Sequence, residues 1–263
     1  MRVGLVVVQY YVSDRELRKF VDALCKILRD HAVEVEEVRV DIRARKDVAH
    51  LQYPFFDISG YCEGLRRLPE GGTAILLNDT FFVKHPWRSY AKALARVLRS
   101  LGRLEVAGAA GAVFPTQNLL LVDENNPTRQ HVSTFLVALN PAGRTIFEML
   151  ASQLPGGEDP LAENWLSRVL SAHRALALIF MLHFGPEPNP WLWSNLPRVT
   201  DERVVQRKKV TVAFEYLLTC ELLRSGGLVL PINVGTRQWL AEQVERLLRR
   251  WMPNPAALIR RGG

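Results

Sequence analysis

The sequence predicts an α/β protein with a mainly parallel central sheet flanked by helices on both faces. Short apolar segments typical of strands alternate along the chain with amphipathic segments typical of helices. The chain has 263 residues, of which 48% are hydrophobic and 23% charged, so it can bury a sizeable core and is not intrinsically disordered. We expect one domain over 1–235, followed by a C-terminal amphipathic helix and tail over 236–263.

The first strand–helix unit lies at the N-terminus. Residues 3–11 are rich in β-branched side chains, as a core strand is, and Ser13 with Glu16 has the spacing of a capping box that opens a helix. Residues 33–41 then alternate apolar and charged side chains, which is typical of a strand near a sheet edge.

A second unit begins with the apolar run 73–78, which predicts a buried strand. Pro86 suits the first position of the next helix, and Gly102 ends it. The remaining chain predicts strands at 106–114, 118–122, 131–140 and 228–232, a helix start at Asn140-Pro141, a loop at 186–198 and a helix at 208–227.

Composition narrows the classes of function. The net charge of +7 and the pI of about 9.6 favour polyanionic partners such as nucleic acid, anionic lipid or nucleotide phosphates. The three cysteines are too far apart for a zinc spacing and odd in number, so we expect reduced thiols in a cytoplasmic protein. No phosphate loop, GxGxxG motif or signal peptide is recognisable, and no apolar run reaches the ~18 residues of a membrane span.

Asn78 and Asp79 raise the sharpest question, because they end a buried strand with an amide and a carboxylate. Ligands in parallel sheets bind beyond the carboxyl ends of the strands, and a desolvated carboxylate needs a partner. A divalent cation bridging Asp79 to a diphosphate would supply one. The alternative is that Asp79 caps the next segment.

Three other segments contain candidate site residues. Residues 56–67 hold Gly60 and Gly64, which either admit a ligand or belong to a turn and a helix. Residues 122–131 form either a ligand-binding loop or a solvated one, with Asp123, Glu124, Arg129 and His131. Glu215 lies in an apolar helix, where it is either a general base or a solvated residue.

Taken in order, these segments resemble nucleotide-diphospho-sugar glycosyltransferases of the GT-A type, which have a Rossmann-like fold. The resemblance covers residues 3 to about 233 and rests on "LVVVQYY", "DISGYCEGL" followed by "AILLNDT", "HVSTFLVALN" and "FEYLLTCELLRSGG". The last three are similar to bacterial rhamnan-synthesis and related polysaccharide glycosyltransferases.

The resemblance implies a role for each matching position. Gln9, Tyr10 and Asp57 would border the nucleotide base, and Gly60 and Gly64 would make room for it. Asp79 would bind Mn or Mg where the family has an Asp-x-Asp motif. This chain has no second aspartate, so a positively charged side chain, Lys84, His85 or Arg129, would instead stabilise the leaving diphosphate. Asn78 and His131 would also bind the substrate, and Ser133, Thr134 and Phe135 would line the sugar or acceptor side. Glu215 or Asp123 would deprotonate the acceptor.

We therefore expect a glycosyltransferase that uses a nucleotide-diphospho-sugar and a glycan or lipid-linked acceptor. The alternative is a non-catalytic protein that binds nucleotide or nucleic acid through its basic surface, although no RNA-binding aromatic motif favours nucleic acid. The helix at 236–252 would attach to an anionic membrane surface, cap the core or form a dimer interface.

Overall fold

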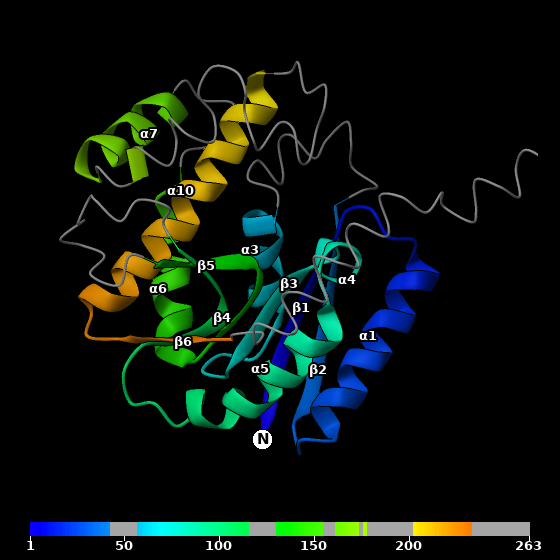
Figure 1. The fold of residues 1–263 in the computed structure, drawn as a ribbon. Helices are drawn as coiled ribbons and strands as arrows, with labels where there is room; N and C mark the ends of the chain where they lie inside the picture. The colour runs from blue at the N-terminus through cyan, green and yellow to red at the C-terminus, as the bar shows by residue number, and fades with distance from the viewer. Residues whose placement is uncertain (43–56, 116–129, 155–160, 174–175, 178–201, 233–263) are drawn as a thin grey trace, which may run out of the picture.

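The computed structural model describes residues 1–42, 57–115, 130–154, 161–173, 176–177 and 202–232 (Figure 1). The strands are β1 (Arg2–Gln9), β2 (Glu34–Asp41), β3 (Ala74–Asn78), β4 (Gly108–Pro115), β5 (Gln130–Leu139) and β6 (Leu228–Pro231). The helices are α1 (Asp14–Arg29), α3 (Asp57–Arg67), α4 (Thr80–Lys84), α5 (Trp87–Leu101), α6 (Pro141–Ser152), α7 (Leu161–Ala172) and α10 (Glu202–Arg224). The predictions at 118–122, 186–198 and 236–263 lie outside these residues.

The strands form one six-stranded sheet in the order β2-β1-β3-β5-β4-β6. The pairs β1–β2, β1–β3 and β4–β6 are parallel, whereas β5 runs antiparallel to both β3 and β4. The predicted α/β class is confirmed, and the sheet is mixed with mostly parallel pairs. Since β5 runs the other way, its beginning lies at the same edge as the carboxyl ends of β1 and β3.

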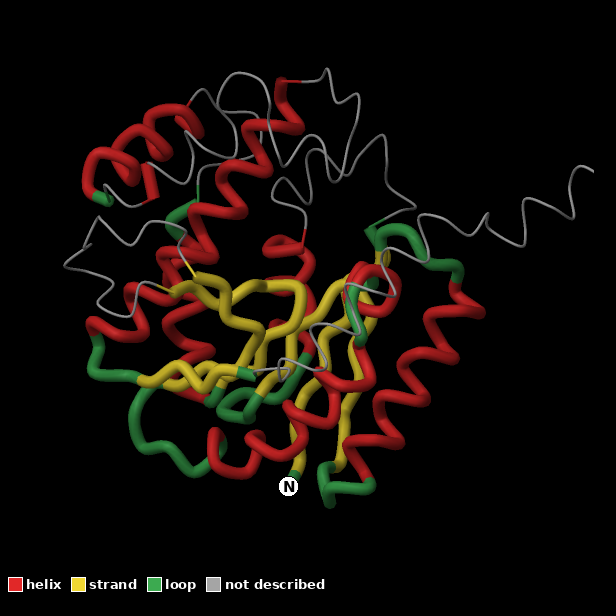
Figure 2. Tube along the Cα trace, viewed as in Figure 1, coloured by secondary structure: helices red, strands yellow, loops and turns green. Residues whose placement is uncertain are grey.

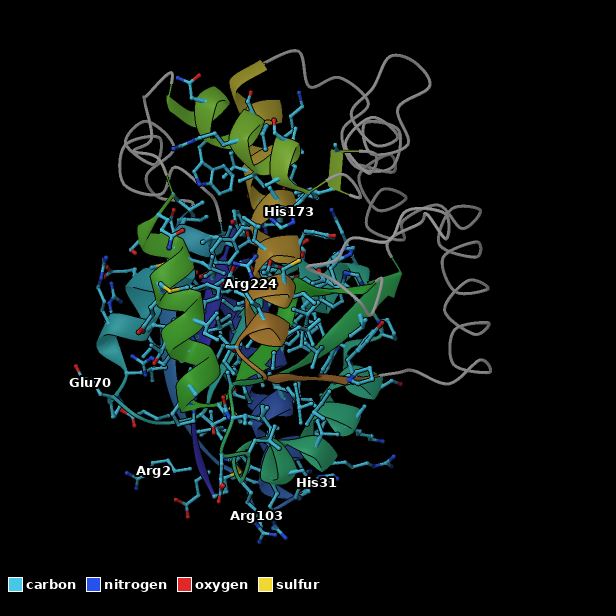
Figure 3. All side chains as sticks on the ribbon, turned by 90° about the vertical axis from the view of Figure 1, so that its left-hand side faces the viewer. Arg2, His31, Glu70, Arg103, His173 and Arg224 are labelled. Atoms are coloured by element: carbon cyan, nitrogen blue, oxygen red, sulfur yellow. The ribbon has the colours of Figure 1, made fainter. Side chains whose placement is uncertain are left out.

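Helices cover both faces of the sheet (Figure 2), and α6 and α10 lie toward the viewer in Figure 3. In β1, Val3, Leu5 and Val7 pack into a core with α1 and α5, whereas Val6 and Val8 pack into a second core with α3, α6 and α10. This division follows from the alternation of side chains along a strand. The side chains of β1 therefore pack against a layer of helices on each face of the sheet, which explains why the strand is apolar at successive positions.

Several predicted helix boundaries are confirmed. Ser13 is the N-cap of α1, and its hydroxyl accepts a hydrogen bond from the Glu16 amide. Asn140 caps α6 by accepting from the Gly143 amide at 2.8 Å. Pro86, which was expected at the first helical position, instead stands at the N-cap of α5, because the helix begins one residue later at Trp87.

Gly60 and Gly64 lie inside α3, which begins at Asp57. A Cβ atom at Gly60 would lie 2.7 Å from Cγ2 of Val8, and one at Gly64 would lie 2.2 Å from Cγ1 of Val6. The two glycines thus let α3 lie close against β1. The structure gives them a packing role, and the space they were expected to leave for a base stays a prediction.

Among the described residues, no helix is long and apolar enough to cross a membrane.

Candidate functional site

Asp79 organises the loop between β1 and α1. Its side chain is fully buried, and its Oδ2 accepts hydrogen bonds from the backbone amides of Tyr10, Tyr11 and Val12 at 2.8, 2.6 and 2.9 Å. The side chain does not cap the following helix. Its other oxygen, Oδ1, is also buried and accepts no hydrogen bond from a described residue. The carboxylate at the strand end is therefore satisfied on one side by the neighbouring loop.

Gln9 also stabilises the loop between β1 and α1. Its Nε2 donates to the backbone oxygen of Val12 at 2.7 Å and to Oδ1 of Asp14 at 2.9 Å. Because these bonds engage the side chain within its own loop, Gln9 positions the chain that follows β1. Its expected contact with a nucleotide base is untested.

Four polar side chains from four elements meet beyond the carboxyl ends of β1 and β3. Asn78 of β3 donates through Nδ2 to Oδ2 of Asp57 in α3 at 3.0 Å. The Thr134 hydroxyl, in β5, lies 3.3 Å from the same Asp57 oxygen and 2.7 Å from Oε1 of Glu215 in α10. The structure thus brings together Asp57, Asn78, Thr134 and Glu215, which the sequence had indicated separately.

Glu215 is held by one of its two carboxylate oxygens. Besides the Thr134 hydroxyl, Oε1 accepts the Thr134 amide at 2.8 Å and the Ser133 hydroxyl at 3.2 Å. The side chain is half-buried, and among the described residues no hydrogen bond reaches Oε2. One turn further along α10, Thr219 accepts the Val132 amide at 3.0 Å. Side chains of α10 therefore accept the amides of alternate residues at the start of β5.

Two lysines lie close enough to the carboxylates of the site for their charges to interact: Lys208 with Asp57, and Lys84 with Asp79. The charge of Lys208, from α10, acts on both Asp57 and Lys84. Loss of surrounding water and then the charge of Lys208 lower the pKa of Lys84, while Asp79 opposes the shift. The Lys84 ammonium also lies 5.9 Å from the centre of the Tyr11 ring, which is 71% exposed. A cationic and aromatic rim thus adjoins the carboxylates.

Burial is the main cause of the pKa shifts of the titratable groups in the site. It raises the pKa of Asp57, as does the negative charge of Glu215, against the opposing effect of Lys208. Burial also raises the pKa of Tyr10 and of Tyr61 well above the usual value. The Tyr61 hydroxyl donates to the backbone oxygen of Thr134 at 2.7 Å, so it fixes β5 at the site.

The other candidate residues have separate surroundings. His131 lies in β5 opposite Phe114, and the His85 ring stacks on that of Phe135 with a centroid distance of 3.9 Å. Asp123 and Arg129 lie outside the described residues.

The described part of the chain does not offer a set of ligands for Mn or Mg. It contains no group of three or more His, Cys, Asp or Glu side chains arranged to hold a metal ion. Asp79 presents only the enclosed Oδ1, since its Oδ2 already accepts three amides. These residues do not fit the expected metal, which stays a prediction from the resemblance alone.

The sequence did hold a signal for Lys208 that was missed. Polar residues at positions 208, 211, 215 and 219 recur every three or four residues in a segment that, apart from Lys209, is otherwise apolar, so they share one face of α10. Tyr61 gave no comparable signal, because its spacing fits the apolar face of α3 equally well.

Comparison with known proteins gives no family for this chain. No family model matches the sequence, and no curated protein or solved structure shows significant similarity to it.

Proposed function

We propose that this protein is a glycosyltransferase of the GT-A type, which moves a sugar from a nucleoside-diphosphate donor to a hydroxyl of a glycan or lipid-linked acceptor. The observation that carries the proposal is the arrangement of Glu215. Three donors hold its Oε1, whereas Oε2 is left for another group. A carboxylate fixed in this way is suited to general-base catalysis.

The position of the cluster supports a nucleotide ligand. It lies beyond the carboxyl ends of the parallel strands β1 and β3, where α/β proteins bind ligands. Tyr11 offers an exposed ring, and Lys84 and Lys208 offer positive charge. The lysines would stabilise the charge that develops on the leaving diphosphate without a metal.

The reaction follows from these roles. The acceptor oxygen forms a bond to the anomeric carbon as the bond from that carbon to the diphosphate oxygen breaks. The nucleoside diphosphate leaves with the electron pair, and Oε2 of Glu215 takes the acceptor proton. Asp57, Asn78 and Thr134 keep the base in place, and Asp79 shapes the loop after β1.

Isothermal titration with a panel of nucleotide sugars, with and without manganese, tests the proposal. We expect one donor to bind to the wild-type protein. Glu215→Gln should retain this binding, but its rate of sugar transfer, or of the slow hydrolysis of the donor without acceptor, should fall by at least tenfold. Glu221→Gln is the matched control, because Glu221 lies on the same helix and pairs with Arg224 at 2.8 Å. Absence of binding to every donor under both conditions would reject the function.

A second candidate is a protein that binds nucleic acid through α5. The helix carries no acidic residue, and its exposed cations Arg88, Lys92, Arg96 and Arg99 form no ion pair with a described residue. Their spacing places them along one stripe, which would attract phosphates.

Retention on immobilised random DNA over a salt gradient tests this candidate. Reversing Arg96 and Arg99 to Glu is expected to shift elution to lower salt. Reversal of the exposed Arg15 and Lys19 on α1 changes the net charge equally and is the control. Equal shifts for both pairs would show that only the overall charge matters.

A further inference from the structure

A line of hydrogen-bonded side chains crosses the site from α4 to α10. It begins with the Thr80 hydroxyl, which donates to Oδ1 of Asn78. The Asn78 amide group donates to Oδ2 of Asp57, and the Thr134 hydroxyl lies between that oxygen and Oε1 of Glu215. Five residues from five elements thus share one chain of contacts.

Counting hydrogens along this chain shows a shortage at Thr134. Its hydroxyl has one hydrogen but lies near two carboxyl oxygens, 2.7 Å from Glu215 and 3.3 Å from Asp57. The hydrogen belongs to the shorter contact with Glu215. An ionised Asp57 would then leave two oxygens facing one another without a hydrogen, whereas a proton on Asp57 Oδ2 turns the contact into a hydrogen bond.

We propose that Asp57 carries a proton on Oδ2 near neutral pH, so that Asp57 donates to Thr134 and every hydrogen in the chain points toward Glu215. The surroundings of the two carboxyl groups favour this order. Oε1 of Glu215 accepts three hydrogen bonds, so it is the acceptor at which the hydrogens of the chain end. Asp57 is 7% exposed, and its Oδ2 accepts only from Asn78 once Thr134 donates to Glu215.

Burial and the charged groups around Asp57 together favour its protonated form. Lys208 on α10 favours the ionised form, and Glu215 on the same helix opposes it. Tyr10 after β1 and Tyr61 on α3 are also neighbours, and the pKa of both is raised by burial, so they are neutral. Burial outweighs the single lysine, and the pKa of Asp57 is raised.

This proton makes Asp57 a positioning residue. It turns the Thr134 hydroxyl toward Glu215, whose Oε1 accepts the last hydrogen of the chain. The meaning of this order for catalysis rests on the function proposed above. The location of the proton does not, because it concerns the protein without substrate.

Infrared spectroscopy locates the proton directly. Near neutral pH we expect the C=O band of a protonated carboxyl group in the wild-type protein, shifted by 13C-labelled aspartate and lost in Asp57→Asn. Glu63→Gln on the same helix, whose partner is Arg67, is expected to retain the band. The isotope experiment needs only the wild-type chain, so it can still reject the proposal if the variant does not fold. Absence of an aspartate-derived band would overturn the proposal.

The pH dependence of unfolding gives a second test with a definite sign. A raised folded-state pKa means that the stabilisation by Asp57 is complete below its unfolded pKa and decreases as pH rises through the folded pKa. The stability of the wild-type protein relative to Asp57→Asn should therefore decrease with increasing pH. An increase with pH would place the charge on Asp57 and contradict the chain order, whether or not a nucleotide sugar binds.

Discussion

Replacing Asp79 should destabilise the protein, because its carboxylate holds the loop after β1. In Asp79→Ala the amides of Tyr10, Tyr11 and Val12 lose their common acceptor. Hydrogen bonds to a charged group contribute about 1.5–3 kcal/mol each, so the three together give a loss of about 4.5–9 kcal/mol. Asp79→Asn retains an acceptor oxygen but not the charge, so its loss should be about half of that.

Urea denaturation followed by circular dichroism measures these losses, and an unchanged slope would show that the unfolded state is unaffected. Asp22→Asn is the control, since Asp22 is exposed on α1 and should change stability by less than about 0.5 kcal/mol. A carboxylate kept mainly for a ligand often destabilises the free protein, so its removal stabilises it. A neutral or stabilising Asp79→Ala would therefore refute the structural role.

Three further predictions concern packing, hydrogen bonding and thiol reactivity. Gly64→Ala should lower the free energy of unfolding by about 1–3 kcal/mol, because the new Cβ would meet Val6 at 2.2 Å. Gly72→Ala, where nothing lies within 4 Å, is the control, and equal effects of the two changes would contradict the reasoning. Thr219→Val should cost about 1–3 kcal/mol by leaving the buried Val132 amide without its acceptor, as thermal unfolding would measure; a Tm equal to that of the wild type would refute the role of Thr219. Burial raises the pKa of Cys25 and Cys62 to about 11, so at pH 8 only about 0.1% of each is thiolate, and a colourimetric disulfide reagent should label them slowly until urea is added. Equally fast labelling without urea would contradict it.

The sequence predicted the local elements well where one physical signal was strong. Ser13 and Glu16 located the start of α1, and the alternating segment 33–41 predicted a strand that lies at the sheet edge. The direction of β5 was not predictable, because an apolar strand has the same side-chain pattern whether its neighbours run parallel or antiparallel. The mainly parallel sheet was predicted, whereas the reversed strand β5 within it is a finding of the structure.

The candidate site was predictable as a set of polar residues but not as a set of contacts. The end of an apolar strand singled out Asn78 and Asp79, yet sequence could not show that the loop after β1 would direct three amides at Asp79. Glu215 stood out as a carboxylate in an apolar helix. Its contact with Thr134, 81 residues away in the chain, depends on how α10 crosses β5.

The insertion of β5 has a consequence for the order in which the protein folds. β3 and β4 both precede β5 in the chain, yet β5 lies between them. Until residue 139 has left the ribosome, the inner edges of β3 and β4 therefore have no strand to pair with. Strand β3, with the sequence "AILLN", is apolar up to its last residue, Asn78, and exposed edges of such strands promote association between chains. Nascent or truncated chains that end before β5 should consequently need a chaperone or aggregate.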